Sequence, residues 1–246
     1  MLILTMSCLY KAPPRVFVED HGELSRSPGV VALVDPIFLD GASGDAFAEG
    51  VFVGSITMSG GFVVDEDDEH GMQTRSKDFV LSSEDSYRSL AAGFVDSSLG
   101  AALDDQGVSW RSVELEAPLP ERRAYRGTHP EDGKDNVNLP RFTLSPTALE
   151  PGSVEGVDVV IVPYVVRYYS HNGGWFIGQH LGCEAGARMR LFWVAYDNTS
   201  GVALAWRDID VRYFEEHLFS PSSAQLEDAL IEVEALVKKD LDRHLF

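Results

Sequence analysis

The sequence contains few cysteines, few basic residues and no long apolar segment, and each absence excludes a class of protein. The two cysteines, Cys8 and Cys183, are too few for a disulfide framework or for a zinc site of four cysteines. Lys and Arg number 20 against 39 Asp and Glu, which gives a formal net charge of -19. An acidic surface repels phosphates, so no nucleic-acid partner is expected. No apolar run reaches the roughly 20 residues that a membrane-spanning helix needs.

Recognisable catalytic motifs are also missing. Met58-Ser59-Gly60-Gly61 follows Thr57, where a nucleophile elbow requires glycine. Gly41-Ala42-Ser43-Gly44 lacks the third glycine of a dinucleotide-binding loop and the lysine of a phosphate-binding loop. We therefore expect a protein that is not an enzyme and that carries no cofactor.

Enough apolar residues remain to build a core. Hydrophobic residues make up 44% of the 246 positions, which excludes wholesale disorder. The length fits one large domain or two small ones. Because the strands on either side of the excursions need each other, we expect a single α/β domain over residues 28–246, with long excursions at 36–81 and 116–154.

The centre of this domain is predicted from an apolar run at residues 157–166. Its β-branched content is typical of a buried strand, and its first half is apolar at consecutive positions, as in a strand covered on both faces. Strand-like runs follow at residues 191–196 and 202–214, on either side of a turn at residues 197–201. The three runs predict one sheet with a hairpin at its centre.

Three residues of this region have specific expected roles. Asp197 can accept hydrogen bonds from backbone N–H groups two residues on, and Gly201 can adopt a positive φ. Pro163 has no N–H, so we expect a missing ladder bond or a bulge at that position.

Two helices are expected to cover the sheet. The first spans residues 82–106, ends at Gly107, and lies between strands at residues 30–34 and 110–115, which predicts a crossover between parallel neighbours. Its apolar face comprises Tyr87, Leu90, Ala91, Phe94, Leu99, Ala102 and Leu103. The second follows Pro221, starts with the capping-box pattern Ser222-x-x-Gln225, and runs to the C-terminus. Its apolar stripe comprises Leu226, Leu230, Val233, Val237, Leu241 and Leu245.

The N-terminus is interpreted as the remnant of a lipoprotein signal. An apolar run ends in Ser7 and Cys8, and Pro13 and Pro14 follow, as in a tether. We expect Cys8 to be the lipidation site and residues 1–27 to form the signal remnant and tether. Acyl chains contribute roughly 0.8 kcal/mol per buried methylene, so a lipoprotein needs no transmembrane helix. The alternative is a cytoplasmic N-terminal segment with an ordinary cysteine.

The order of these elements resembles bacterial envelope lipoproteins of the CsgG, LpoB and TolB N-terminal-domain group. The resemblance is carried by the strand at residues 30–34, by the Asp158 that precedes the central apolar run, and by the hairpin of residues 191–206 with Asp197 and Gly201 in its turn. It implies a single mixed sheet with packed helices, including a long C-terminal helix. No functional residue is transferred from that group.

Several side-chain clusters leave alternatives open. His171, His180, Cys183 and Glu184 lie in a glycine-rich stretch that we expect to be a hairpin tip, and they are the weak candidates for a metal site. A disulfide between Cys8 and Cys183 is a separate possibility. The acidic run at residues 65–70 is either a divalent-ion site or, as we favour, a solvated loop. Arg122, Arg123 and Arg126 form an anion-binding patch or part of a surface excursion.

The functional hypothesis follows from these points. We expect a lipoprotein of the bacterial cell envelope, palmitoylated and anchored to the outer membrane or another envelope membrane, with its domain facing the periplasm. That domain binds an envelope protein or self-associates. The alternative is a metal-binding protein or metal-dependent enzyme that uses residues 171–184.

Overall fold

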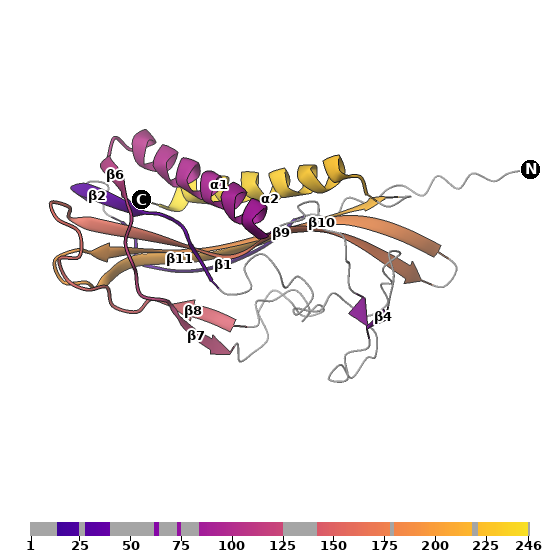
Figure 1. Ribbon diagram of the computed structural model, residues 1–246, viewed down its shortest axis with the longest axis horizontal. Coiled ribbons are helices and arrows are strands. Elements are labelled where there is room, and N and C mark those ends of the chain that lie inside the picture. The colour runs from indigo at the N-terminus through magenta and orange to yellow at the C-terminus, as the bar shows by residue number, and fades with distance from the viewer. Residues whose placement is uncertain are drawn as a thin grey trace, which may run out of the picture.

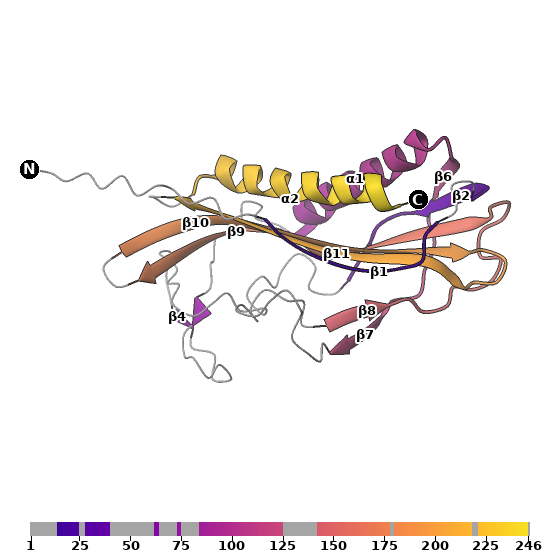
Figure 2. The same cartoon turned by 180° about the vertical axis from the view of Figure 1, so that it is seen from behind.

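In the part of the chain that the structure describes, one large mixed sheet carries two helices on one of its faces. The computed structural model describes residues 14–24, 28–39, 62–63, 73–74, 84–124, 142–177, 180–217 and 221–245. Both helices lie on the same side of the sheet, and a small two-stranded sheet lies on the other side (Figures 1 and 2). The expected class, an α/β fold with a single mixed sheet and a long C-terminal helix, is confirmed.

The large sheet has the strand order β1-β11-β10-β9-β2-β6, with β3 beside β9. Its members are β1 (Arg15–His21), β2 (Val30–Val34), β3 (Ile37–Phe38), β6 (Ser109–Val113), β9 (Val159–Ile177), β10 (His180–Asp197) and β11 (Ala203–His217). Strands β9, β2 and β6 are parallel, whereas β1, β11, β10 and β9 pair antiparallel. Two small sheets pair β4 (Phe62–Val63) with β5 (Gln73–Thr74), and β7 (Glu121–Ala124) with β8 (Phe142–Ser145).

The predicted crossover is confirmed. Strand β2, helix α1 (Glu84–Asp105) and strand β6 follow in sequence, and β2 and β6 are parallel neighbours. Gly107 ends the helix with φ 67° and donates its N–H to the carbonyl of Asp104 at 2.9 Å. The expected apolar face is wrong at Leu90, which is 52% exposed, whereas Val95 is fully buried. The buried row of α1 follows the i, i+4 spacing from residue 91, and position 90 lies on its flank.

Strand β9 is the central strand, as predicted. Val159 and Ile161 pack into the core beneath the helices, and Val160 and Val162 pack into the core on the opposite face. Pro163 stays in register opposite Trp193, so of the two expected alternatives, a missing ladder bond or a bulge, the bulge does not occur at this position. The register shifts three residues later, where Val166 is the extra residue of β9 opposite the step from Arg190 to Leu191.

Helix α2 (Ser223–His244) covers the centre of the sheet. Ser222 caps it, and Gln225 completes a capping box, as predicted. All six residues of the expected apolar stripe are buried, together with Ala229. The stripe packs on β9, β10 and β11, and the apolar core on this face lies between the helix and these three strands.

Two segments differ from the sequence interpretation. Residues 15–21, which that interpretation places in the tether, form strand β1 and pair with β11 over their whole length. The glycine-rich stretch at residues 170–186 is paired strand up to Ile177 and again from His180, because continued pairing satisfies its backbone N–H and C=O groups. The acidic run at residues 65–70 lies outside the described residues.

Candidate functional site: the β1 edge and the cavity at its end

The turn between β10 and β11 is built as the sequence predicts. Oδ1 of Asp197 accepts hydrogen bonds from the backbone N–H groups of Thr199 and Ser200, at 2.7 and 2.8 Å. These bonds lower the pKa of the exposed Asp197 carboxyl. Gly201 has φ 71°, and a Cβ there would lie 2.0 Å from the carbonyl oxygen of Leu149. The turn therefore requires glycine for both its backbone angle and its close contact with the preceding loop.

Asn198 fastens this turn to the start of β9. Its buried side chain donates to the carbonyl groups of Val154 and Val157, at 2.7 and 2.9 Å, and accepts from the N–H of Val154 at 3.3 Å. Its own N–H donates to the carbonyl of Asp158 at 3.0 Å. One side chain thus satisfies three backbone groups that would otherwise be buried without partners.

Charged residues alternate with apolar ones along β10 and β11, and they are buried on the sheet face opposite the helices. Arg188 binds Asp210 through two hydrogen bonds of 2.8 and 2.5 Å. Arg190 binds Asp208 in the same bidentate way, at 2.9 and 2.6 Å. Arg212 adds a third contact to Asp210 at 3.3 Å. We call these five residues the ion-pair ladder.

Burial and neighbouring charges oppose each other in the ladder, and at Asp208 burial outweighs the Arg190 guanidinium and raises the pKa of the carboxyl. Burial lowers the pKa of Arg190 and the Asp208 carboxylate raises it; the net shift is upward, so this guanidinium stays protonated. Burial also acts on Asp210, but Arg188 and Arg212 outweigh it and hold the pKa of Asp210 well below its usual range. Burial lowers the pKa of Arg188 to about 10, which still leaves it charged at pH 7.

On the helix side, Arg207 joins three elements. Its guanidinium donates to both carboxylate oxygens of Asp240 on α2, at 2.6 and 2.7 Å. It also forms an ion pair with Asp20 on β1. Arg207 therefore ties the edge strand and the second helix to β11.

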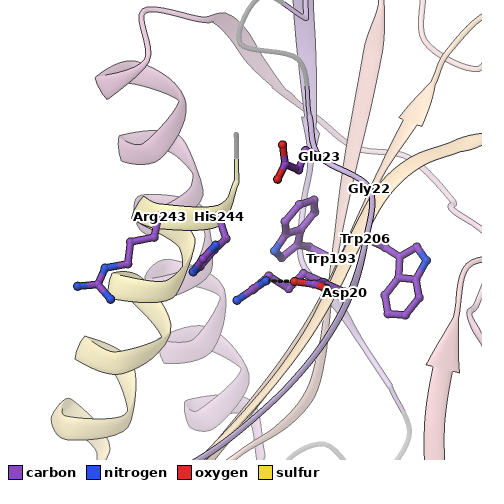
Figure 3. A pocket seen from close by; sticks show the side chains of 8 residues that line it. Asp20, Gly22, Glu23, Trp193, Trp206, Arg243 and His244 are labelled. Atoms are coloured by element: carbon purple, nitrogen blue, oxygen red, sulfur yellow. Dashed lines mark hydrogen bonds and ion pairs between the residues drawn. The ribbon is translucent and has the colours of Figure 1, made fainter.

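A cavity of about 510 Å³ opens where β1 ends. It is lined by Asp20, Gly22, Glu23, Trp193, Trp206, Arg207, Arg243 and His244. Figure 3 shows Arg243 and His244 on the last turn of α2, with Trp193 on the helix side of β1 and Trp206 on the far side. Trp193 is 2% exposed, and its indole N–H has no acceptor in the described part of the chain.

The outer edge of β1 is the second feature of this site. Strand β1 ends the strand order, so its outer backbone groups pair with no other strand that the structure describes. Seven residues at about 3.3 Å each give an edge of roughly 23 Å. In Figure 2, β1 lies along the near edge of the sheet, beneath α2. Val16 on this strand is 48% exposed. An open edge of this length is a template for pairing with another chain.

The structure does not describe the side chains of the residues predicted for lipidation and metal binding. Cys8 lies outside the described residues. His171 lies in β9 opposite Gly186, and His180, Cys183 and Glu184 lie in β10, where Glu184 is opposite Gly173. The side chains of these four metal candidates are outside the described part, so that hypothesis stays a prediction. Among the described side chains, no group of three His, Cys, Asp or Glu is placed to hold a metal ion.

The arginine cluster is also only partly described. Arg122 lies exposed in β7, the side chain of Arg123 is not described, and Arg126 lies outside the described residues.

Sequence reasoning missed the ion-pair ladder and the β1 edge. The ladder has a signal in the sequence: arginines at 188 and 190, and charges at 208, 210 and 212, recur every second residue with one apolar residue between successive charges. In a strand this spacing places all of them on one face. Charges of opposite sign on adjacent strands then predict ion pairs.

Comparisons with known proteins leave the family open. No described helix combines the length and apolarity of a membrane span. No family model and no curated protein matches the chain. Among solved structures, two forms of the PelC dodecamer from Paraburkholderia phytofirmans are similar over 93% of this chain and 98% of theirs, with 10% identity and TM-scores of 0.35 and 0.34. Likeness at this level is too weak to transfer assembly or function to this chain.

Proposed function

We propose that this chain is a non-enzymatic lipoprotein of the bacterial cell envelope, whose domain binds a protein partner or a further copy of itself along the open edge of β1. The observation that carries the proposal is the edge itself. It offers a row of backbone donors and acceptors, and a strand added there gains main-chain hydrogen bonds along its whole length.

The edge strand is held rigidly, which favours binding. Every residue of β1 from 15 to 21 is in register with β11. Asp20 is ion-paired to Arg207, and His21 stacks on Trp206 with ring centroids 6.3 Å apart. A strand fixed in this way does not have to be ordered when a partner binds, so less conformational entropy is lost.

The expected lipid anchor is only seven residues from this edge in the sequence. Cys8 precedes the first residue of β1 by seven positions, and seven extended residues reach at most about 25 Å. An acylated Cys8 therefore keeps β1 near the membrane surface, where anchored proteins meet at high local concentration. The anchor and the edge act together in this proposal.

Two measurements test the proposal. Mass spectrometry of the membrane fraction should find Cys8 acylated, and Cys8→Ser should release the protein from membranes, whereas Cys183→Ser should not. A photo-crosslinking residue at Val16 should capture a protein in living cells. The same residue at Val202, which is 58% exposed in the β10–β11 turn, should not. An unmodified Cys8 in a fully soluble product would contradict the lipid anchor. Equal crosslinking from Val16 and Val202 would contradict binding at the β1 edge.

A further inference from the structure

The geometry of β1 indicates which partner binds along its outer edge. We infer that a second copy of this chain pairs antiparallel with β1, with Phe17 opposite Phe17 of the second copy. This inference rests on the proposed function, because it names the partner of the same edge. It follows from the two faces of the strand, from the symmetry of an antiparallel pair, and from the order of charges along the strand.

The two faces of β1 have different chemistry. Val16 and Val18 lie opposite Val211 and Ile209 of β11, on the helix side of the sheet. Residues 15, 17 and 19 lie opposite residues 212, 210 and 208, on the side of the ion-pair ladder. Positions 16, 18 and 20, which hold Val, Val and Asp, thus lie on the helix side, and positions 15, 17, 19 and 21 lie on the ladder side.

Symmetry restricts the possible registers. Two identical edges that pair antiparallel are related by a twofold axis perpendicular to the sheet, so the helices of both copies cover the same face. Residues directly opposite each other must then come from the same face of the strand. Only registers centred on a single residue satisfy this condition. The register centred on residue 18 pairs all seven residues of β1, and those centred on residues 17 and 19 pair five each. The register centred on residue 19 places Glu19 opposite Glu19 of the second copy, which is unfavourable.

Charge and apolarity select the register centred on Phe17. It places Arg15 opposite Glu19 of the second copy, twice by symmetry, and Val16 opposite Val18, also twice. Every pair is then either opposite in charge or apolar on both sides. The register centred on Val18 instead places Phe17 opposite Glu19 and Val16 opposite Asp20, which leaves carboxylates against apolar side chains.

Glu19 has a buried carboxylate oxygen that can accept a further hydrogen bond. Its Oε2 atom is shielded from solvent and accepts no hydrogen bond from the described residues. Burial and the neighbouring Asp208 carboxylate both raise its pKa, although Arg190 opposes them. A guanidinium across a twofold interface would stabilise the charged form of this carboxylate.

The interface is small and depends on the anchor. Five paired residues on each side bury much less than the roughly 1,000 Å² that stable interfaces exceed. In dilute solution the pair is therefore weak. Tethering both copies to one membrane raises their effective concentration, into the millimolar range for short flexible tethers, so association occurs without new contacts. We expect dimers on membranes and monomers in dilute solution.

Register-specific crosslinking tests the inference. The full-length, membrane-anchored chain is used with Cys183→Ser, which removes the competing thiol. Chains with Val16→Cys are co-expressed with chains carrying Val18→Cys and treated with a mild oxidant. Residues directly opposite in an antiparallel pair have Cα atoms about 4.5–5.5 Å apart, within disulfide range. Mixed pairs should give at least fivefold more crosslinked dimer than pairs in which Val202→Cys replaces either variant.

Charge exchange provides the second arm, read by the same crosslink. Arg15→Glu in both copies, or Glu19→Arg in both copies, should reduce the dimer at least fivefold, because like charges then face each other. Copies with Arg15→Glu mixed with copies carrying Glu19→Arg should restore it, because every facing pair is again opposite in charge. The variants are compared only if their circular dichroism matches the wild-type spectrum. If Glu19→Arg does not fold, Glu19→Gln replaces it in the single-variant test, where it should also reduce the dimer because the facing charge is lost.

The outcomes separate this inference from the proposed function. Crosslinking between positions 16 and 18 no stronger than with position 202 overturns the twofold pairing. If Cys8 is nevertheless acylated and Val16 still captures a different protein, the edge binds another partner and the proposed function stands. If Cys8 is unmodified and dimers still form at the predicted register, the pairing stands and the anchor does not.

Discussion

Removing one partner of the buried Arg190–Asp208 pair should strongly destabilise the fold. Both residues are buried, and the two guanidinium–carboxylate bonds measure 2.9 and 2.6 Å. Asp208→Asn keeps the shape of the side chain but leaves the guanidinium without its counter-ion. Breaking a buried pair in this way costs about 3–5 kcal/mol. Asp210 and Glu19 also lie near the Arg190 charge and compensate part of it, so we expect the lower end, about 3 kcal/mol.

Urea unfolding followed by tryptophan fluorescence measures this cost directly. For a chain of 246 residues, each kcal/mol lowers Tm by about 2–4 °C, so a fall of about 6–12 °C should accompany the substitution. The matched control is Asp242→Asn, which breaks the exposed Lys238–Asp242 pair and should cost at most about 0.5 kcal/mol.

A double replacement, Arg190→Met with Asp208→Leu, removes the stranded charge and should recover most of the lost stability. If Asp208→Asn costs no more than Asp242→Asn, or if the double replacement is no better than the single one, burial of the charge does not control stability at this position.

Three further predictions follow from single positions. Gly201→Ala should cost at least about 2 kcal/mol by urea unfolding, because a left-handed residue with a Cβ costs about 1–2 kcal/mol and the new Cβ also meets the Leu149 carbonyl. Burial raises the pKa of Glu234, which accepts the Tyr168 hydroxyl, so ionisation above that pKa weakens the native state. Glu234→Gln should therefore raise Tm at pH 7 and lose this advantage below about pH 4, where Glu is protonated in both states. Arg188 and Arg212 outweigh burial and lower the pKa of Asp210 in the folded protein. The Asp210 carboxylate therefore stabilises the fold fully above its unfolded pKa of about 3.9, and this contribution is lost as the pH falls toward the folded pKa. The difference in Tm between wild type and Asp210→Asn should shrink from pH 5 to pH 2.

The centre of the fold was predictable because it is recorded in local patterns. An uninterrupted β-branched run identifies β9 as a strand covered on both faces, and the Asp197–Gly201 turn specifies the β10–β11 hairpin. The 3.6-residue stripe and capping box identify α2 almost to the residue. Each of these signals lies within about 20 consecutive residues, where sequence periodicity determines which face is buried.

The edge strand could not be predicted in the same way. Strand β1 has three consecutive apolar residues followed by Glu19 and Asp20, and this run is too short to be distinguished from a tether. Its pairing joins Arg15 to Arg212, far apart in the chain, so the information that makes it a strand lies in β11. The ion-pair ladder depends on the register between β10 and β11, which sequence spacing alone does not fix.

The ladder fixes that register, and with it the orientation of the edge. Side chains alternate between the two faces of a strand, so a slip of β11 by one residue would move Asp208 and Asp210 into the apolar core beneath the helices. Buried ion pairs contribute little net stability compared with apolar residues of the same size, but a misplaced buried charge is very costly. The main effect of the ladder is therefore to destabilise wrong registers of β11. Because β1 is aligned on β11, the same constraint decides that the valines of β1 face the helices and that Glu19 faces the ladder, which is the arrangement that an incoming strand must match.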